Sequence, residues 1–285
     1  MTKPFQMNAT HGKLGVQAII FFAAFAFLYY PFILTMIADW EVNDNYSHGY
    51  FIPFISAYLI YEMRDELKKG RILPTNWGFV LIIIGLMQLV VAKIGSEYFL
   101  QRTSMIVVLF GAALFLAGKE FAKKIWFPLV YLFFMIPVPA IIWNKFAFPM
   151  QLFASAITEK VILALGIPIF REGNVLHLAQ TTLEVVDACS GLRSLVTMFA
   201  LSAVLAYMAK GTVIKKWLLF LAAAPIAVLA NIIRLTGTAA LAHRFGEGVA
   251  QGFLHDFSGW LVFVLGLMIL IGFKSLLENK SNQNK

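Results

Sequence analysis

The sequence predicts an all-α polytopic membrane protein. Hydrophobic residues make up 60% of the 285 residues, and charged residues make up only 13%. The mean hydropathy is +0.78. Several apolar runs exceed the roughly 18 residues that a helix needs to cross a bilayer. No internal repeat, low-complexity tract or linker divides the chain, so we expect residues 1–285 to form a single transmembrane domain.

Nine apolar segments are candidates for membrane spans. They lie near residues 15–37, 49–61, 77–95, 103–117, 125–143, 146–168, 190–209, 217–241 and 257–273. The segment 146–168 is the weakest candidate, because it carries a polar stripe at helical spacing. The stripe consists of Gln151, Ser155, Thr158 and Glu159. This pattern is typical of an amphipathic helix in the outer interface or of a re-entrant hairpin.

The distribution of charge predicts the orientation of the spans. Without the segment 146–168, about eight transmembrane helices remain, and both termini lie in the cytoplasm. Fifteen of the 23 basic residues and five of the 15 acidic residues then face the cytoplasm, in agreement with the positive-inside tendency. The net charge of +8 is therefore a signal of topology, and nucleic acid is not an expected partner.

This topology places residues from about 144 to 187 on the outer side of the membrane. Within this region the stretch NVLHLAQTTLEVVD shows modest apolar alternation around a polar centre. Such alternation predicts a short hairpin-like segment at the extracytoplasmic surface.

Arg234 is the clearest ionisable residue inside an apolar segment. It stands in LANIIRLTGTAALAH, about six residues or roughly 9 Å from the outer end of its helix. An arginine at the centre of a span costs about 2.5–3.5 kcal/mol on insertion scales, so such residues usually mark function. Asn231 lies three residues earlier, on the same helix face. The alternative is an arginine that reaches the interface and only sets the depth of its helix.

Cys189 is the only cysteine of the chain and stands in VVDACSGLRSL. Arg193 follows four residues later, on the same face of the predicted helix. This cation and the positive end of a helix that opens near Ser190 would stabilise a thiolate, whereas Asp187 acts in the opposite direction. The alternative is an inert cysteine that packs as a small hydrophobic residue.

Four of the five histidines fall on the outer side by this topology. They are His48, His177, His243 and His255. A thiol, an arginine and a histidine that converge from different helices have the parts needed for thiol acyl transfer. The sequence has no Walker A loop, HExxH or GxSxG motif, and a single cysteine cannot supply a multi-cysteine metal site. We therefore expect neither a metal nor a cofactor.

These residues resemble the exosortase/archaeosortase family of membrane-embedded cysteine proteases and transpeptidases. The resemblance rests on DACSGLRSL around Cys189, on NIIRLTG around Arg234, and on HDFSG, which begins at His255. The stretch NYSHGYFIP near the N-terminus is similar to the early His-Gly segment of the family. The order and spacing of these motifs extend through nearly the whole chain.

The resemblance implies a role for each matching residue. Cys189 would be the nucleophile, Arg234 the oxyanion stabiliser or thiolate partner, and His255 the general acid/base. Arg193 and Asn231 would be supporting residues. The role of His48 stays open, and His177 and His243 stay alternatives for the acid/base.

The resemblance also implies the substrate and the compartment. Family substrates are exported proteins with a tripartite C-terminal sorting signal of the PEP-CTERM kind, made of a short motif, a transmembrane helix and a basic cluster. The basic cluster would stay at the cytoplasmic face, so the motif would lie at the outer face. The enzyme would act in the prokaryotic cytoplasmic (inner) membrane through an acyl-enzyme. It would release the product or pass it to an acceptor such as a glycan or lipid, in association with exopolysaccharide and surface proteins.

Two other classes of function remain open at this point. A transporter or lipid flippase could use Arg234 and Asn231 to bind an anionic group. Paired halves would favour this class, and the sequence shows none. A membrane acyl- or glycosyltransferase would be expected to carry an acidic catalytic cluster. The outer acids Asp39, Glu41 and Asp44 are better explained as a solvated loop.

Overall fold

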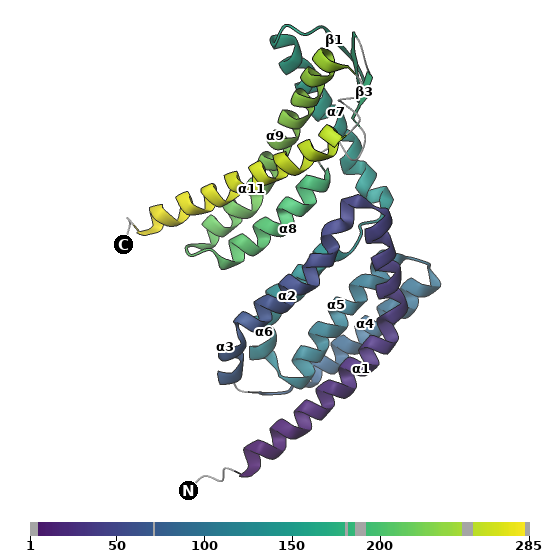
Figure 1. Ribbon diagram of the computed structural model, residues 1–285. Coiled ribbons are helices and arrows are strands. Elements are labelled where there is room, and N and C mark those ends of the chain that lie inside the picture. Colours follow the sequence, from purple (N-terminus) through teal and green to yellow (C-terminus); the bar gives the residue numbers. More distant parts are fainter. Residues whose placement is uncertain (1–4, 71, 180–181, 186–191, 247–252, 283–285) are drawn as a thin grey trace. The chain divides into compact units, whose positions relative to one another are not determined.

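The computed structural model confirms an all-α polytopic membrane protein (Figure 1). It describes residues 5–70, 72–179, 182–185, 192–246 and 253–282. The chain forms two compact units, Met1–Val138 and Pro139–Lys285. We describe each unit by itself, and the single domain expected from the sequence stays a prediction.

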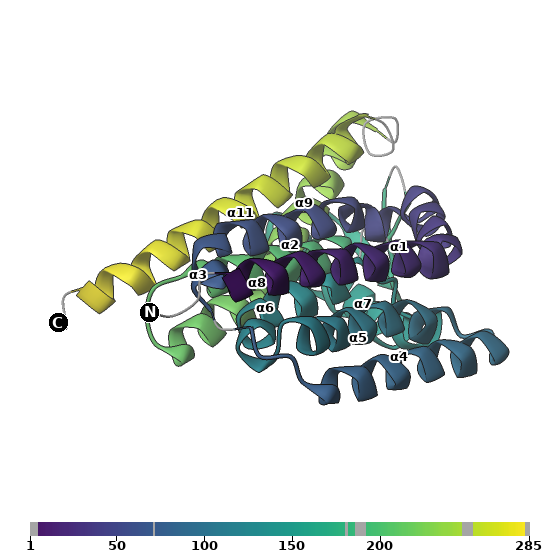
Figure 2. The same cartoon turned by 90° about the horizontal axis from the view of Figure 1, so that it is seen from below.

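The first unit contains six helices and two short 3-10 turns among its described residues. They are α1 (Phe5–Val42), η1 (Asp44–Tyr50), α2 (Phe51–Glu62), α3 (Arg64–Lys69), α4 (Asn76–Ile94), α5 (Tyr98–Leu116), α6 (Lys119–Tyr131) and η2 (Leu132–Met135). Helices α4 and α5 lie side by side, as Figures 1 and 2 both show. Their approach is close because Gly78 faces the backbone of Phe115 and the carbonyl of Gly111.

The second unit combines a helical bundle with a small sheet. Its described elements are α7 (Ala140–Ala164), β1 (Ile169–Glu172), β2 (Val175–Leu178), β3 (Thr182–Glu184), α8 (Leu192–Met208), α9 (Val213–Phe245) and α11 (Phe253–Asn282). Helix α9 packs against α7, α8 and α11. The core between α8, α9 and α11 is centred on Met198, Leu219 and Leu270, which are almost fully buried. Helix α9 is therefore the central element of this unit.

Six helices in the described part of the chain are long and apolar enough to cross a membrane. They comprise Gly15–Val42, Asn76–Ile94, Tyr98–Leu116, Ala140–Ala164, Val213–Phe245 and Gly259–Asn279. Large apolar side chains on these helices are exposed, as expected where hydrocarbon covers the protein surface. Helix α2 has 12 residues and α8 has 17, so both are shorter than these six. The eight crossings and the cytoplasmic termini stay predictions.

The helix expected over 146–168 is present, but it begins earlier and has different surroundings. Helix α7 runs unbroken from Ala140 to Ala164, so it is not a re-entrant hairpin. Its polar stripe does not face an interface, because Ser155 and Thr158 are fully buried inside the protein. The Ser155 hydroxyl donates to the carbonyl of Gly173 at 3.1 Å. The turn between β1 and β2 thus supplies a polar partner for Ser155.

The short hairpin predicted from the sequence is confirmed and has one additional strand. Strands β2 and β3 pair antiparallel with His177 opposite Thr182, and β1 pairs with the other edge of β2. The turn between β1 and β2 contains Gly173 at φ +63°, a conformation that glycine adopts without steric cost. Leu176 is fully buried, and it joins the sheet to α7 and α9 through Ala154 and Leu235.

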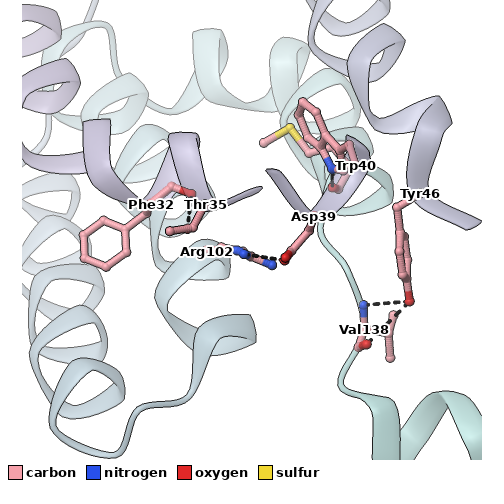
Figure 3. A network of polar contacts seen from close by, with 8 residues as sticks. Phe32, Thr35, Asp39, Trp40, Tyr46, Arg102 and Val138 are labelled. Atoms are coloured by element: carbon pink, nitrogen blue, oxygen red, sulfur yellow. Dashed lines mark hydrogen bonds and ion pairs between the residues drawn. The ribbon is translucent and has the colours of Figure 1, made fainter. Parts of the chain in front are cut away.

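A network of polar contacts joins α1, α5 and the segment after α6 in the first unit. Figure 3 shows the Arg102 guanidinium and the Asp39 carboxylate pointing toward each other, 2.6 Å apart. The Trp40 indole donates to the carbonyl of Met135 at 2.8 Å, and the Val138 N–H donates to the Tyr46 hydroxyl at 3.1 Å. Asp39 therefore lies in the last turn of α1 as an ion-pair partner, and the expectation that it belongs to a solvated loop is wrong.

Gly78→Ala is expected to destabilise the first unit. A Cβ at this position would lie 2.6 Å from the Gly111 carbonyl oxygen, so α4 and α5 would have to separate. Overpacking of this kind costs about 1–3 kcal/mol of unfolding free energy. Thermal unfolding of the detergent-solubilised protein measures the loss. Gly15→Ala is the control, because a Cβ at Gly15 meets nothing within 4 Å. Equal unfolding temperatures for the two variants would contradict the packing argument.

Asp39→Asn is expected to lower the unfolding free energy by about 2 kcal/mol, because the buried Arg102 guanidinium keeps its charge and loses its carboxylate. The effect is smaller than for a fully enclosed pair, since the Asp39 side chain is 48% exposed. The double variant Asp39→Asn/Arg102→Met removes both charges and is expected to recover most of the loss. A double variant as unstable as the sum of the two single variants would show that the pair has no coupled role.

Candidate functional site

Three of the sequence motifs belong to the second unit. The cysteine motif stands between β3 and α8, Arg234 and Asn231 stand on α9, and His255 stands near the start of α11. Cys189 itself lies outside the described residues, and so does the side chain of His255. The described residues show the framework around these two positions.

The chain on both sides of the cysteine motif is held in the protein. Val185 is fully buried against Leu176 and Leu235. Its N–H donates to the carbonyl of Asn174 at 2.9 Å, and the Asn174 amide donates to the Val185 carbonyl at 3.2 Å. On the other side, Leu192 is only 3% exposed and begins α8. Sheet and helix thus fix the two ends of the motif.

Arg193 lies in the first turn of α8 and is half-buried. Its carbonyl accepts a hydrogen bond from the Thr197 hydroxyl at 2.9 Å. The predicted helix after the cysteine is therefore present, and Arg193 stands at its N-terminal end. This end carries the positive side of the helix dipole, which favours a nearby anion.

Arg234 and Asn231 share one face of α9, as their spacing predicts. Asn231 is 4% exposed, and Arg234 is half-buried. Leu235, the residue after the arginine, belongs with Val185 to the core between α7, α9 and the sheet. Val185, which precedes Cys189 by four residues, therefore shares a buried core with the turn of α9 that carries Arg234.

The Arg234 guanidinium lies against the backbone of α11 at Gly259. A Cβ at Gly259 would be 3.2 Å from Cζ, 3.3 Å from Nη2 and 3.5 Å from Nη1 of Arg234. Two turns later, Gly266 approaches Met198 and Ala230, so one glycine-bearing face of α11 packs on α8 and α9. Position 255 lies one turn before Gly259 on this same face. Sequence reasoning missed Gly259, although it is the glycine of HDFSG, four residues after the histidine.

His48 lies in the first unit, in the 3-10 turn η1, and is 8% exposed. Its Nε2 is 3.1 Å from the carbonyl oxygen of Phe134 in η2. Burial lowers the pKa of the His48 imidazole, and the carbonyls of Phe134 and Asn45 oppose this shift without overcoming it. These contacts favour a packing role for His48, which joins η1 to η2.

His177 and His243, the alternative histidines, have partners or surroundings of their own. His177 on β2 stacks on Phe170, with ring centroids 6.0 Å apart, and its Nδ1 is 3.3 Å from the Thr182 hydroxyl. His243 in the last turn of α9 lines an open hollow with Ile167 and Phe245. Among the described residues, no cluster of three or more His, Cys, Asp or Glu side chains could hold a metal ion.

A fall in pH is expected to destabilise the protein through His48. The folded state has a lowered pKa, whereas the unfolded histidine takes up a proton below about pH 6.5, so stability falls as the pH drops through this value. We expect the unfolding temperature of His48→Gln to change less between pH 7.5 and 5.5 than that of the wild type. His177→Gln is the comparison variant, because it removes an imidazole that is 40% exposed and not buried. Identical pH profiles for His48→Gln and wild type would exclude this role.

Comparison with known proteins identifies the family. A family model described as transmembrane exosortase matches residues 40–272, most of the chain, and this range includes all the motifs described above. No curated protein and no solved structure matches the chain. The family match and the long apolar helices agree on a multi-pass membrane protein, and the chain belongs to the transmembrane exosortase family.

Proposed function

We propose that the chain is a membrane-embedded cysteine protease/transpeptidase that cleaves the C-terminal sorting signal of exported proteins. One observation carries the proposal beyond the family match. The Arg234 guanidinium packs on α11 one turn after position 255, in the unit that also contains the cysteine motif. A cation, a histidine position and a thiol motif thus belong to one compact part of the chain.

The chemistry proceeds in two steps. The Cys189 thiolate attacks the scissile carbonyl carbon, and the oxyanion that forms is stabilised by Arg234. His255 donates a proton to the leaving amine as the C–N bond breaks, which leaves a thioester between substrate and enzyme. An acceptor nucleophile or water then gives its proton to His255 and attacks the thioester, and the thiolate leaves. Arg193 and Asn231 support the charged groups.

The described residues limit how far the thiol can lie from this framework. Cys189 is three residues before Leu192 and four residues after Val185, and both of these residues are buried. Three residues of extended chain reach about 11 Å. Val185 also belongs to the same buried core as Leu235, the residue next to Arg234. These limits support a common site for Cys189 and Arg234.

The proposed substrate follows from the membrane itself. A tripartite signal of the PEP-CTERM kind ends in a basic cluster, which the positive-inside effect holds at the cytoplasmic face. Its motif would then meet Cys189 at the extracytoplasmic face of a prokaryotic inner membrane. Exported proteins that carry this signal are the proposed partners, and a glycan or lipid acceptor fits a role in surface or exopolysaccharide attachment.

Cys189→Ala is expected to abolish removal of the tail from a co-expressed exported protein that bears a tripartite signal. The substitution removes the only thiol, so no thioester can form. The measurement is the shift of the substrate on a gel, with membrane insertion and the unfolding temperature of the variant checked in parallel. Wild-type enzyme should also yield a substrate-linked species that hydroxylamine cleaves.

Histidine variants test the second catalytic role with a matched control. We expect His255→Gln to lose processing at least 100-fold, in line with general acid/base catalysis, whereas His177→Gln and His243→Gln retain it. Unchanged processing by a folded Cys189→Ala protein would overturn the mechanism. Arg234 and Asn231 would then be examined as the anion site of a transporter.

A further inference from the structure

We infer that Gly259 is a positioning residue for Arg234. Its missing side chain allows the guanidinium to lie flat on the backbone of α11 beside the histidine position, with the N–H donors held in one plane. This inference rests on the proposed function, since it assigns to Gly259 the placement of the group that stabilises the oxyanion.

The three distances define how the guanidinium meets the helix. A Cβ at Gly259 would be closest to Cζ, at 3.2 Å, and slightly farther from the two terminal nitrogens, at 3.3 and 3.5 Å. In the plane of a guanidinium, Cζ is surrounded by three nitrogens, so a neighbour in that plane meets a nitrogen first. A neighbour that is nearest to Cζ therefore approaches over the flat face. Arg234 presents this face to α11.

The flat contact decides where the donors of Arg234 point. All five N–H groups of a guanidinium lie in its plane, and the face carries none. A guanidinium that rests on α11 by its face directs its N–H groups parallel to the helix surface. A substrate carbonyl oxygen that lies between α9 and α11 near position 255 would then accept hydrogen bonds from two of these N–H groups at once.

Other glycines of α11 show that this contact is specific to Gly259. A Cβ at Gly272 meets nothing within 4 Å, so a glycine in this helix does not by itself indicate close packing. A Cβ at Gly266 meets the terminal methyl of Met198 at 3.3 Å, a flexible apolar group that can move aside. Among these three glycines, Gly259 is the one whose Cβ would meet a charged group.

A methyl group at position 259 would shift the guanidinium by a few tenths of an ångström. Misplacement of a catalytic group by about 1 Å can cost about 100-fold in rate, so a smaller shift should cost less. We expect Gly259→Ala to lower kcat for tail removal about five- to tenfold and to change KM less than about twofold. The helix should not weaken, because alanine has a higher helix propensity than glycine.

The decisive experiment is a double-mutant cycle on reconstituted enzyme with a tripartite-signal substrate. Gly259→Ala is measured in the wild type and in an Arg234→Lys background, and Gly272→Ala is the matched control in both. If Gly259 acts through the guanidinium, Gly259→Ala loses its effect once the planar group is absent, and Gly272→Ala is neutral throughout. A loss of equal size in both backgrounds, or a Gly259→Ala enzyme as active as Gly272→Ala, overturns the inference.

The same assay separates this inference from the proposed function. A Cys189→Ala enzyme that still removes the tail would refute the thiol mechanism, whatever Gly259 does. An inactive Cys189→Ala enzyme together with a fully active Gly259→Ala enzyme would leave the mechanism standing and refute the positioning role alone. Unfolding temperatures of all variants are measured in detergent. A lowered value for Gly259→Ala would assign its effect to helix packing and also count against the inference.

Discussion

Polar groups that cannot reach water are stabilised by partners inside the protein, and such pairs occur in both units. Hydrocarbon offers no hydrogen bonds, so an unpaired polar group there costs several kcal/mol. In the first unit the Ser56 hydroxyl donates to the Pro128 carbonyl, and Asp39 pairs with Arg102. In the second unit Ser155 donates to Gly173 of the sheet. In each of these cases a polar group of a helix meets a partner within the protein.

Close helix contacts are the second means by which the units hold together. Lipid tails are as apolar as leucine side chains, so hydrophobic burial contributes little between helices, and tight packing becomes more important. Gly78 and Gly111 bring α4 and α5 into backbone contact. Ala223 and Ala227 of α9 are almost fully buried against neighbouring helices. At Gly259 the same small-residue approach admits a cation, which connects the packing of the bundle with the proposed chemistry.

Much of the fold could be predicted from the sequence, because its strongest signals are local. Long apolar runs predicted the helices, and alternation after Asn174 predicted the β2–β3 pair. Strand β1 was missed, since its four residues Ile169–Glu172 are defined by pairing to β2 more than by a pattern of their own. Helical periodicity predicted the polar face of α7 correctly. It contained no information on the sheet that covers this face. Asp39 was assigned to a loop because its partner Arg102 is more than sixty positions away.

The candidate site shows the same limit. Spacing placed Asn231 with Arg234 on one face, and the structure agrees. The contact between Arg234 and Gly259 joins two helices, and a single sequence contains no information on such a pair beyond the glycine itself. Family resemblance and chemistry assign the catalytic roles of Cys189 and His255. The variants of these two residues test those roles.

The contact between α9 and α11 has a consequence for how the protein is made. Helix α9 leaves the ribosome before α11, so Arg234 reaches the membrane before the backbone of Gly259 is available to cover it. An arginine inside a lone span opposes insertion, by about 2.5–3.5 kcal/mol when it lies at the centre. We expect α9 to stay near the translocation channel until α11 emerges, and the two helices then to enter the lipid as a pair. During biogenesis α11 would thus be the partner that allows the earlier helix α9 to insert stably into the lipid.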